Sequence, residues 1–308
     1  MMKDTGRIIF SATVIDNQES YRKWFSSMQT EEEKQNNILH LKGIQDFRQT
    51  GIFQTSDKNS PLYDATFEVM GSVAISANGE KSVAVMVFAI IDPKGNPCWG
   101  HTSIDYEGGE TTVSYSPRAG LAGLKDLQGV LTHEIPVNQS LYDQHAVVDY
   151  KFEYEFKPHV PVAHMRNSYK NKGKGYSLHG AHIKWFAKPL CGEYEMELNH
   201  QEGVVVTDDP NCPLFNTRYF GKSFRFKYND THKALSDCMP NRYVDNEGNI
   251  IWLVGQWWYG DHIGCDHLIA ATGKWKNTKL YLFYDGTKIG VDARADNAFV
   301  CHFEYEYE

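Results

Sequence analysis

Two short stretches, 152 positions apart, decide the fold of this chain. Gly51 to Tyr63 reads GIFQTSDKNSPLY, and Gly203 to Phe215 reads GVVVTDDPNCPLF. The two stretches share Gly, Thr, Asp, Asn, Pro and Leu at matching positions, six identities in thirteen. Such agreement without a gap indicates an internal repeat.

The same register continues toward the end of each half. Phe152 to Phe156 reads FEYEF and Phe303 to Tyr307 reads FEYEY, at an offset of 151, and turn glycines recur as Gly120 and Gly273, at an offset of 153. Ordered blocks with so little drift predict a tandem duplication of a unit of about 150 residues, a usual domain size. We therefore expect a first repeat over 1–157, a connector rich in Lys, Gly and Asn over 158–175, and a second repeat over 176–308.

The hydrophobic pattern inside each unit is typical of β-strands. Val83 to Ile91 is a continuous apolar run, which suits a strand that is covered on both faces. Phe224 and Phe226 alternate with Arg225 and Lys227, which suits a strand with one buried face. With Gly, Asp and Asn turns between the runs, the pattern predicts an all-β fold made of two tandem antiparallel β-barrels.

One segment near the N-terminus has helical spacing instead. Tyr21, Trp24, Phe25 and Met28 recur at i, i+3, i+4 and i+7, and three glutamates follow them. This pattern predicts a short amphipathic helix whose aromatic stripe packs against a barrel. A docking surface for a partner is the alternative interpretation of the stripe.

Charge and composition exclude several classes of function. The net charge of −8 and the isoelectric point near 5.9 argue against a nucleic-acid partner. The N-terminal MMKDTGRIIF lacks the apolar run of a signal peptide, and no stretch reaches the ~18 apolar residues of a membrane span, so we expect a cytoplasmic protein without a membrane span. A nucleophile elbow, a phosphate-binding glycine loop and a dinucleotide fingerprint are absent from the sequence, which disfavours common hydrolases, kinases and dehydrogenases.

The end of each repeat resembles a known family. Ala119 to Leu131 reads AGLAGLKDLQGVL and is followed after a loop by YKFEYEF, and the second half has ATGKWKNTKLYLFY and FEYEYE at the corresponding places. These runs resemble the closing turn and last strand of the allene oxide cyclase barrel superfamily, especially its small uncharacterised bacterial members. Dirigent-like and lipocalin-like barrels have similar closures.

The resemblance implies an eight-stranded antiparallel barrel in each half, with a mainly apolar interior for a small lipophilic molecule. Family members of known activity fold a reactive polyene or oxylipin in that cavity and release it cyclised, without a cofactor. None of the family's catalytic residues aligns with this chain, so the residues of the chain itself must indicate a site.

The richest candidate stretch lies just before the closing turn of the second repeat. Aromatic, acidic and imidazole side chains are concentrated there, as Trp257, Trp258, Tyr259, Asp261, His262, Cys265, Asp266 and His267. In an extended strand His262 and Asp266 share one face, while Asp261 and His267 share the other. A barrel interior receives only one of the two sets.

Three interpretations of this stretch remain open. A His/carboxylate pair inside the barrel would act as a general acid and base, with His262 and Asp266 preferred and His267 with Asp261 as the alternative register. Polar residues at a barrel rim are also often plain solvated turn residues. A metal site is the third interpretation, but the spacing matches no known metal motif and we predict no metal.

The function predicted from the sequence is a cofactor-independent cyclase or isomerase. Its substrate would be a small lipophilic molecule of polyene, oxylipin or aromatic type, held in the second barrel by Trp257, Trp258, Tyr259 and Trp275. The alternative is a non-catalytic carrier or sensor of a small hydrophobic ligand, and a homo-oligomer is left open. An acid–base group that points inward among aromatic side chains would favour the enzyme. In the first repeat, the polar row His101, Ser103, Asp105 and Glu107 is interpreted as the water-facing side of a strand.

Overall fold

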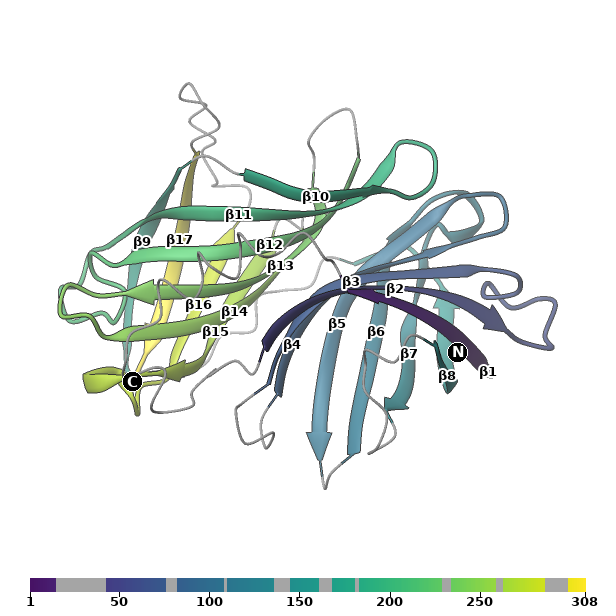
Figure 1. The fold of residues 1–308 in the computed structure, drawn as a ribbon, viewed down its shortest axis with the longest axis horizontal. Helices are drawn as coiled ribbons and strands as arrows, with labels where there is room; N and C mark the ends of the chain where they lie inside the picture. Colours follow the sequence, from purple (N-terminus) through teal and green to yellow (C-terminus); the bar gives the residue numbers. More distant parts are fainter. Residues whose placement is uncertain are drawn as a thin grey trace.

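The fold was established from a computed structural model of the chain (Figure 1). The structure describes residues 1–14, 43–75, 82–107, 110–135, 145–160, 168–180, 183–228, 234–258, 263–285 and 299–308. The predicted helix over Tyr21 to Met28 lies outside the described residues. Among the described residues no helix is long and apolar enough to cross a membrane.

The first half forms a closed barrel of eight antiparallel strands in chain order. The strands are β1 (Met2–Val14), β2 (Gly43–Gln54), β3 (Thr66–Ile75), β4 (Ser82–Ile91), β5 (Pro97–Glu107), β6 (Glu110–Gly120), β7 (Leu127–Ile135) and β8 (His145–Phe156). β1 pairs with both β2 and β8, which closes the ring. A 3₁₀ turn, η1 (Ala122–Leu124), connects β6 to β7.

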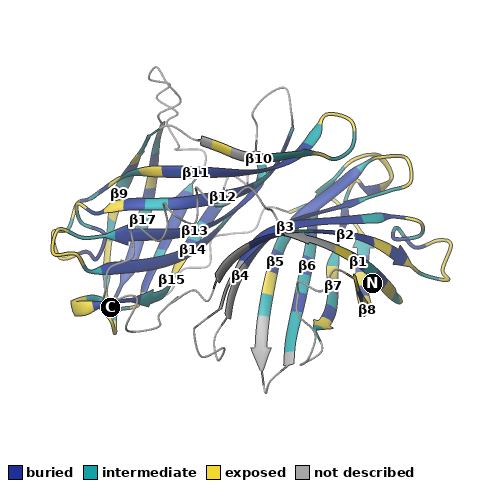
Figure 2. Cartoon of the chain, viewed as in Figure 1, coloured by how far each residue is buried: buried dark blue, intermediate teal, exposed yellow. Residues whose placement is uncertain are grey.

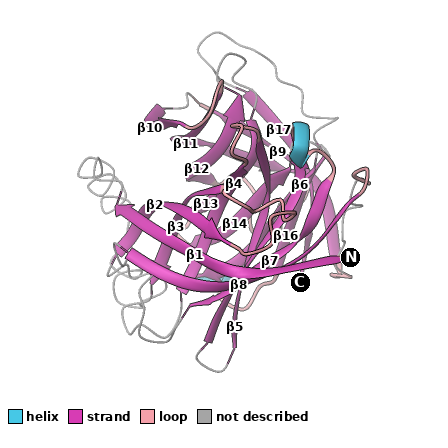
Figure 3. Ribbon diagram, turned by 90° about the vertical axis from the view of Figure 1, so that its right-hand side faces the viewer, coloured by secondary structure: helices cyan, strands magenta, loops and turns pink. Residues whose placement is uncertain are grey.

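The second half repeats this plan with one extra strand. Its strands are β9 (Asn171–His179), β10 (Ile183–Pro189), β11 (Tyr194–Thr207), β12 (Arg218–Tyr228), β13 (Ala234–Val244), β14 (Ile250–Trp258), β15 (Ile263–Ala271), β16 (Leu280–Asp285) and β17 (Phe299–Tyr307). β9 pairs with β17 and with the later part of β11, so β9 and β11–β17 form a closed ring. β10 pairs with the earlier part of β11 outside that ring. The prediction of two antiparallel barrels is therefore confirmed, and strands dominate every view of the molecule (Figure 3).

The repeat register places equivalent residues at equivalent points of the two rings, with one correction. Gly51 pairs with Phe10 and Phe67, and Gly203 makes the same kind of pair with His179 and Tyr219. Gly273, however, begins the 3₁₀ turn η3 (Gly273–Trp275) with φ of 55°, and the residue with that place and conformation in the first half is Ala122, with φ of 44°. Gly120 lies two positions earlier, at the end of β6.

The connector expected over 158–175 overlaps the first strand of the second barrel, because β9 begins at Asn171. Gly173 and Gly175 face the barrel interior beneath the rings of Tyr305 and Phe303. A Cβ added at Gly173 would lie 2.2 Å from the Tyr305 hydroxyl oxygen, and one at Gly175 would lie 2.6 Å from the Phe303 ring. The glycines that indicated a flexible linker thus serve close packing inside a strand.

The two barrels pack against each other through their outer surfaces. Met70, Val85, Val87, Ala89 and Trp99 of the first barrel share one buried cluster with Met196, Leu198, Phe224, Phe226, Cys238 and Val254 of the second. The ring centroids of Trp99 and Phe226 are 5.4 Å apart. β4 is consequently buried on both faces, as its continuous apolar run predicts, and the buried strands at this junction are dark blue in Figure 2.

The two barrel interiors differ in chemistry. The first barrel is filled by a continuous apolar and aromatic cluster that includes Phe47, Phe67, Phe88 and Phe152. The second has an apolar cluster over part of its length, and its remaining inward positions carry buried charged and amide side chains. An apolar interior, as the family resemblance implies, therefore describes the first barrel and only part of the second.

Candidate functional site

The predicted site stretch contributes one carboxylate to the interior of the second barrel. Asp266 pairs across the sheet with Gly255 on one side and Leu282 on the other, and both lie on the inward face. Its side chain is fully buried, with a relative exposure of 0%. The alternation of β15 places Asp266 inside the barrel and His267 outside it.

The surroundings of Asp266 change its acidity. Burial raises the pKa of the Asp266 carboxyl to about 7, because a charged carboxylate is poorly solvated in the interior. Hydrogen bonding from Tyr284, Asn241 and Trp257 opposes this rise, and the negative charge of Asp237 adds to it. A carboxyl with such a pKa is present in both protonation states near neutral pH.

The contacts of the two carboxyl oxygens of Asp266 differ. The Tyr284 hydroxyl donates a hydrogen bond to Oδ2 at 3.2 Å, and the Asn241 amide nitrogen donates to the same oxygen at 3.5 Å. Oδ1 has no partner within hydrogen-bond geometry among the described residues, although the indole of Trp257 is close enough to lower the pKa of the carboxyl. Oδ2 is therefore held in place by two hydrogen bonds, whereas Oδ1 is buried against the backbone of Gly255.

Two glycines make room for this arrangement. A Cβ added at Gly255 would lie 1.8 Å from Asp266 Oδ1, and a Cβ added at Gly264 would lie 2.7 Å from the Trp257 ring. Trp257 in turn packs on Tyr284, with ring centroids 4.2 Å apart. The carboxyl thus lies over bare backbone, with an aromatic pair beside it.

The other predicted site residues whose side chains the structure describes do not gather around Asp266, apart from Trp257. Trp257 is buried in the barrel core, and His267 is exposed on the outer face. Trp275 lies in η3 at the closing corner, where its Nε1 donates to Asp245 Oδ2 at 2.9 Å. Trp258 ends β14. Tyr259, Asp261 and His262 lie outside the described residues, so the predicted pairs of His262 with Asp266 and of His267 with Asp261 stay predictions.

The sequence interpretation missed a ladder of charged residues inside the second barrel. The ladder is formed by inward residues of β11, β12 and β13: Glu195, Glu197, Asn199, Ser223, Arg225, Lys227 and Asp237. Lys227 Nζ lies 2.8 Å from Glu195 Oε1 and 2.8 Å from Glu197 Oε2. Arg225 Nε lies 2.8 Å from Asp237 Oδ2, and the Ser223 hydroxyl donates to Asp237 Oδ1 at 2.7 Å.

The electrostatics of the ladder follow from these pairs. Burial alone would lower the pKa of Lys227, but Glu195 and Glu197 outweigh it and raise that pKa. Burial opposes ionisation of Glu197, yet hydrogen bonds from Lys227 and Asn199 lower the pKa of its carboxyl. Lys227 and Glu197 are therefore paired as opposite charges, whereas burial raises the pKa of the Asp237 carboxyl despite the opposing effects of Arg225 and Ser223. Within the described residues no group of three or more His, Cys, Asp or Glu side chains could hold a metal ion.

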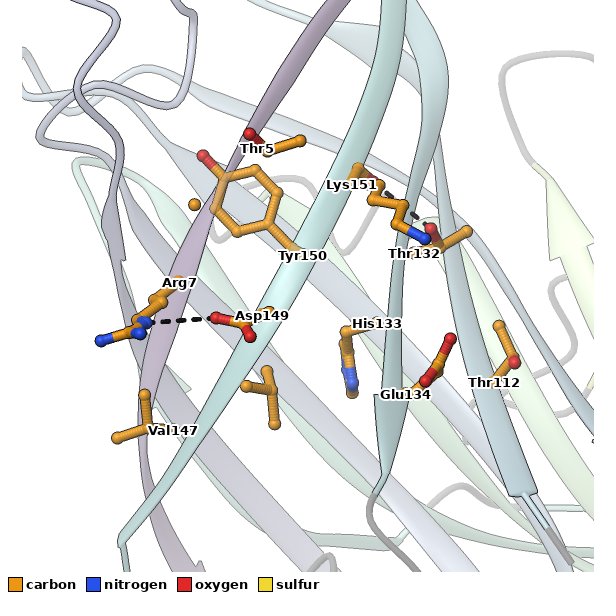
Figure 4. Close-up of a pocket in the computed structure, with 12 residues that line it drawn as sticks. Thr5, Arg7, Thr112, Thr132, His133, Glu134, Val147, Asp149, Tyr150 and Lys151 are labelled. Carbon is orange, nitrogen blue, oxygen red and sulfur yellow. Dashed lines mark hydrogen bonds and ion pairs between the residues drawn. The ribbon is translucent and has the colours of Figure 1, made fainter.

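A second candidate site is a groove on the outside of the first barrel (Figure 4). Its volume is about 620 Å³, and it is lined by residues of β1, β6, β7 and β8: Thr5, Gly6, Arg7, Thr112, Thr132, His133, Glu134, Val147, Val148, Asp149, Tyr150 and Lys151. No feature of the sequence singled out this set, because its members come from four strands. His101 lies elsewhere, half-buried on β5, where burial and the charge of Arg118 lower its pKa to about 4.

His133 is the buried polar group of this groove. Its side chain is 4% exposed, and the Tyr115 hydroxyl and His133 Nε2 lie 3.4 Å apart. Nδ1 has no hydrogen-bond partner within the described residues. Burial lowers the pKa of His133 to about 4, with a partly opposing contribution from the backbone of Glu134, so the imidazole is neutral near pH 7.

No family model matches this chain, and no curated protein matches it. Among solved structures it matches the outer membrane protein OpdK from Pseudomonas aeruginosa, at 8% identity and a TM-score of 0.19, over 100% of this chain and 98% of that one. It also matches OccK2 (OpdF) from the same organism, at 7% identity and a TM-score of 0.18, over 99% and 96%. A BenF-like porin from Pseudomonas fluorescens matches at 8% identity and a TM-score of 0.13, over 99% and 98%.

These matches correct two predictions. The sequence predicted a cytoplasmic protein without a membrane span, whereas the similar solved structures include outer membrane proteins, so neither prediction is retained. The prediction rested on the absence of a long apolar run, and that signal detects helical spans alone. TM-scores of 0.19 and below do not establish a shared fold, and no function is carried from these proteins to this chain.

Proposed function

We propose that the second barrel catalyses a cofactor-independent isomerisation or cyclisation of a small molecule, with Asp266 as the group that moves the proton. The observation that carries the proposal is a fully buried carboxyl whose pKa is about 7, held among aromatic side chains. General acids and bases work best when their pKa lies near the operating pH. Asp266 meets that requirement without a histidine partner.

The neighbours of Asp266 have separable roles in this proposal. Tyr284 and Asn241 position the carboxyl through Oδ2. Oδ1, above the bare backbone of Gly255, is the oxygen that would take a proton from the substrate and return it at another atom. Trp257 would pack against the substrate and exclude water from the reacting atoms.

The proposed substrate is amphipathic. Leu253 and Leu282 lie on the inward face near Asp266 and belong to the apolar cluster of the barrel. The charged ladder of β11–β13 lies in the same interior, and its member Asp237 is close enough to raise the pKa of Asp266. A lipophilic body with one polar end matches these two surfaces. A barrel of the allene oxide cyclase type remains our proposal for the family.

The test begins with the ligand. Native mass spectrometry of the purified chain should reveal a retained small molecule, and incubation of that molecule or its precursor with the protein should yield an isomer of unchanged mass. Asp266→Asn, which keeps the size of the side chain, should lower turnover by on the order of 10²-fold or more. Glu153→Gln, which changes an exposed carboxylate of the first barrel outside the groove, is the matched control and should leave turnover unchanged.

The alternative is a carrier, and the same experiment separates the two. A ligand that is retained by the wild type and by Asp266→Asn alike, and that is released chemically unchanged from both, would contradict the enzyme and support the carrier. Tyr284→Phe adds a second readout, because the loss of its hydrogen bond to Oδ2 should raise the pKa of the Asp266 carboxyl and shift the pH profile of turnover upward.

A further inference from the structure

We propose that the groove on the first barrel binds a neutral polyhydroxylated molecule of the size of a mono- or disaccharide. The groove has about 620 Å³, within the usual range of small-molecule sites. The proposal is independent of the chemistry at Asp266, which lies inside the other barrel.

The groove follows from the way two neighbouring strands separate. The pairing of β7 with β8 ends at His133 and Tyr150. Beyond that pair β7 remains bonded to β6 as far as Ile135, and β8 remains bonded to β1 as far as His145. β7 and β8 therefore separate from each other while each stays paired with its other neighbouring strand. Figure 4 shows His133 between them.

The charges around the groove cancel. Arg7 and Lys151 are cationic, Asp149 and Glu134 are anionic, and Arg7 Nε lies 3.1 Å from Asp149 Oδ1. A groove with equal numbers of both signs has no net attraction for an ion. It does offer strong hydrogen-bond donors and acceptors within a short distance of each other, which suits hydroxyl groups because each of them both donates and accepts.

The threonines of the groove extend the same chemistry. Thr5, Thr112 and Thr132 add three hydroxyl groups to the lining, and Val147 adds an apolar surface against which the carbon face of a sugar ring would pack. The Thr132 hydroxyl donates a weak bond, at 3.4 Å, to the backbone oxygen of Lys151 and remains able to accept one. β7 thus presents a hydroxyl and a carboxylate to the groove, and β8 presents a carboxylate and a cation.

The imidazole of His133 provides the independent indication of a ligand. A buried nitrogen without a hydrogen-bond partner costs free energy, so it is uncommon in the interior of a folded protein. The His133–Tyr115 bond uses Nε2, and whichever of the two donates it, Nδ1 offers one further bond as a donor or as an acceptor. A ligand hydroxyl satisfies either case, whereas a carboxylate or an ammonium ion satisfies only one.

The experiment measures binding of maltose and lactose to the full chain by isothermal titration and by ligand-observed NMR. We expect a Kd on the order of 1 mM for at least one of them, since such hydrogen bonds contribute little each. Glu134→Gln with Thr132→Val should weaken that binding at least about tenfold, which corresponds to the loss of one or two hydrogen bonds. Glu153→Gln is the matched control, because Glu153 is an outward carboxylate of β8 that pairs with Lys3 outside the groove.

Three outcomes would overturn the proposal. One is the absence of binding by both sugars at concentrations far above 1 mM. Another is binding that Glu134→Gln with Thr132→Val leaves unchanged. The third is binding of glycine betaine in place of the sugars, which would assign the groove to a dipolar ion. His133→Phe, which keeps an aromatic ring in the core, checks the role of Nδ1 and should weaken sugar binding while the thermal unfolding midpoint stays within a few degrees.

Discussion

Lys222 of the second barrel and Asp46 of the first form an ion pair in the junction between the barrels, with Nζ 2.5 Å from Oδ1. Both side chains are almost completely buried, at 2% and 0% exposure. Both lie on the outer faces of their own barrels, so the pair exists only while the barrels are packed together. The apolar cluster that contains Trp99 and Phe226 lies in the same junction.

The first prediction concerns this pair. Lys222→Met would leave the carboxylate of Asp46 buried without its cation, and removing one partner of a buried pair typically costs about 3–5 kcal/mol. We expect the free energy of unfolding, measured with urea, to fall by that order. Lys222→Met combined with Asp46→Leu should recover most of the loss, because neither charge of the pair then remains.

The control for the first prediction is an exposed pair. Arg7 and Asp149 have side chains that are 65% and 84% exposed, and Arg7→Met should change the free energy of unfolding by less than about 1 kcal/mol. If Lys222→Met had an equally small effect, the pair would not contribute to the packing of the barrels.

The second prediction uses the glycine beneath Asp266. Gly255→Ala places a Cβ at 1.8 Å from Asp266 Oδ1, so the carboxyl must move. We expect a loss of about 1–3 kcal/mol in the free energy of unfolding, the usual cost of overpacking, together with loss of turnover. Gly123→Ala is the matched control, since the nearest atom to its added Cβ is 3.8 Å away, and it should be close to neutral. A stable Gly255→Ala variant with full turnover would argue against Asp266 as the working group.

The third prediction follows from the raised pKa of Asp266. The group titrates at about 7 in the folded chain and near its ordinary value of 3.8 when unfolded, so the folded state binds more protons between those two values. Stability should therefore fall as pH rises through that window, by at most about 1.4 kcal/mol per pH unit from this group. Relative to Asp266→Asn, the wild type should lose free energy of unfolding from pH 4 to pH 7 and remain parallel to the variant above that. A constant difference between the two across the window would show that the pKa is not raised.

The sequence predicted the barrels and the strand that carries Asp266, but not the partners of that residue. The FEYEF and FEYEY runs and the shared glycine motif establish the repeat and its register. Alternation along β15 correctly separates Asp266 from His267. Tyr284, however, comes from β16 and Asn241 from β13, and their meeting at Asp266 depends on the register of several strand pairs, which no local pattern encodes.

Alternation along β12 predicted a strand with one buried face, whereas the structure buries both faces, for a physical reason. Phe224 and Phe226 alternate with Arg225 and Lys227, and an isolated barrel would turn the aromatic rings inward. Here the rings pack on the other barrel, and the charged side chains face the interior. Periodicity reveals that two faces differ, but it does not reveal which face a second domain will cover.

The fourth prediction tests whether the charged face of β12 points into the second barrel. Lys227 is 2% exposed and neutralises two buried carboxylates, Glu195 and Glu197, each 2.8 Å away. Lys227→Met should lower the free energy of unfolding by about 3–5 kcal/mol, because both glutamates would remain buried without their nearest cation. Lys184, at 3.5 Å, and Arg225, which also acts on Glu197, are the cations that stay nearby. Adding Glu195→Gln and Glu197→Gln to Lys227→Met should restore part of that stability by removing the uncompensated charge. If Lys227→Met instead proved as harmless as Lys279→Met, whose side chain is 64% exposed, the lysine would lie in water and the aromatic face of β12 would be the inward one.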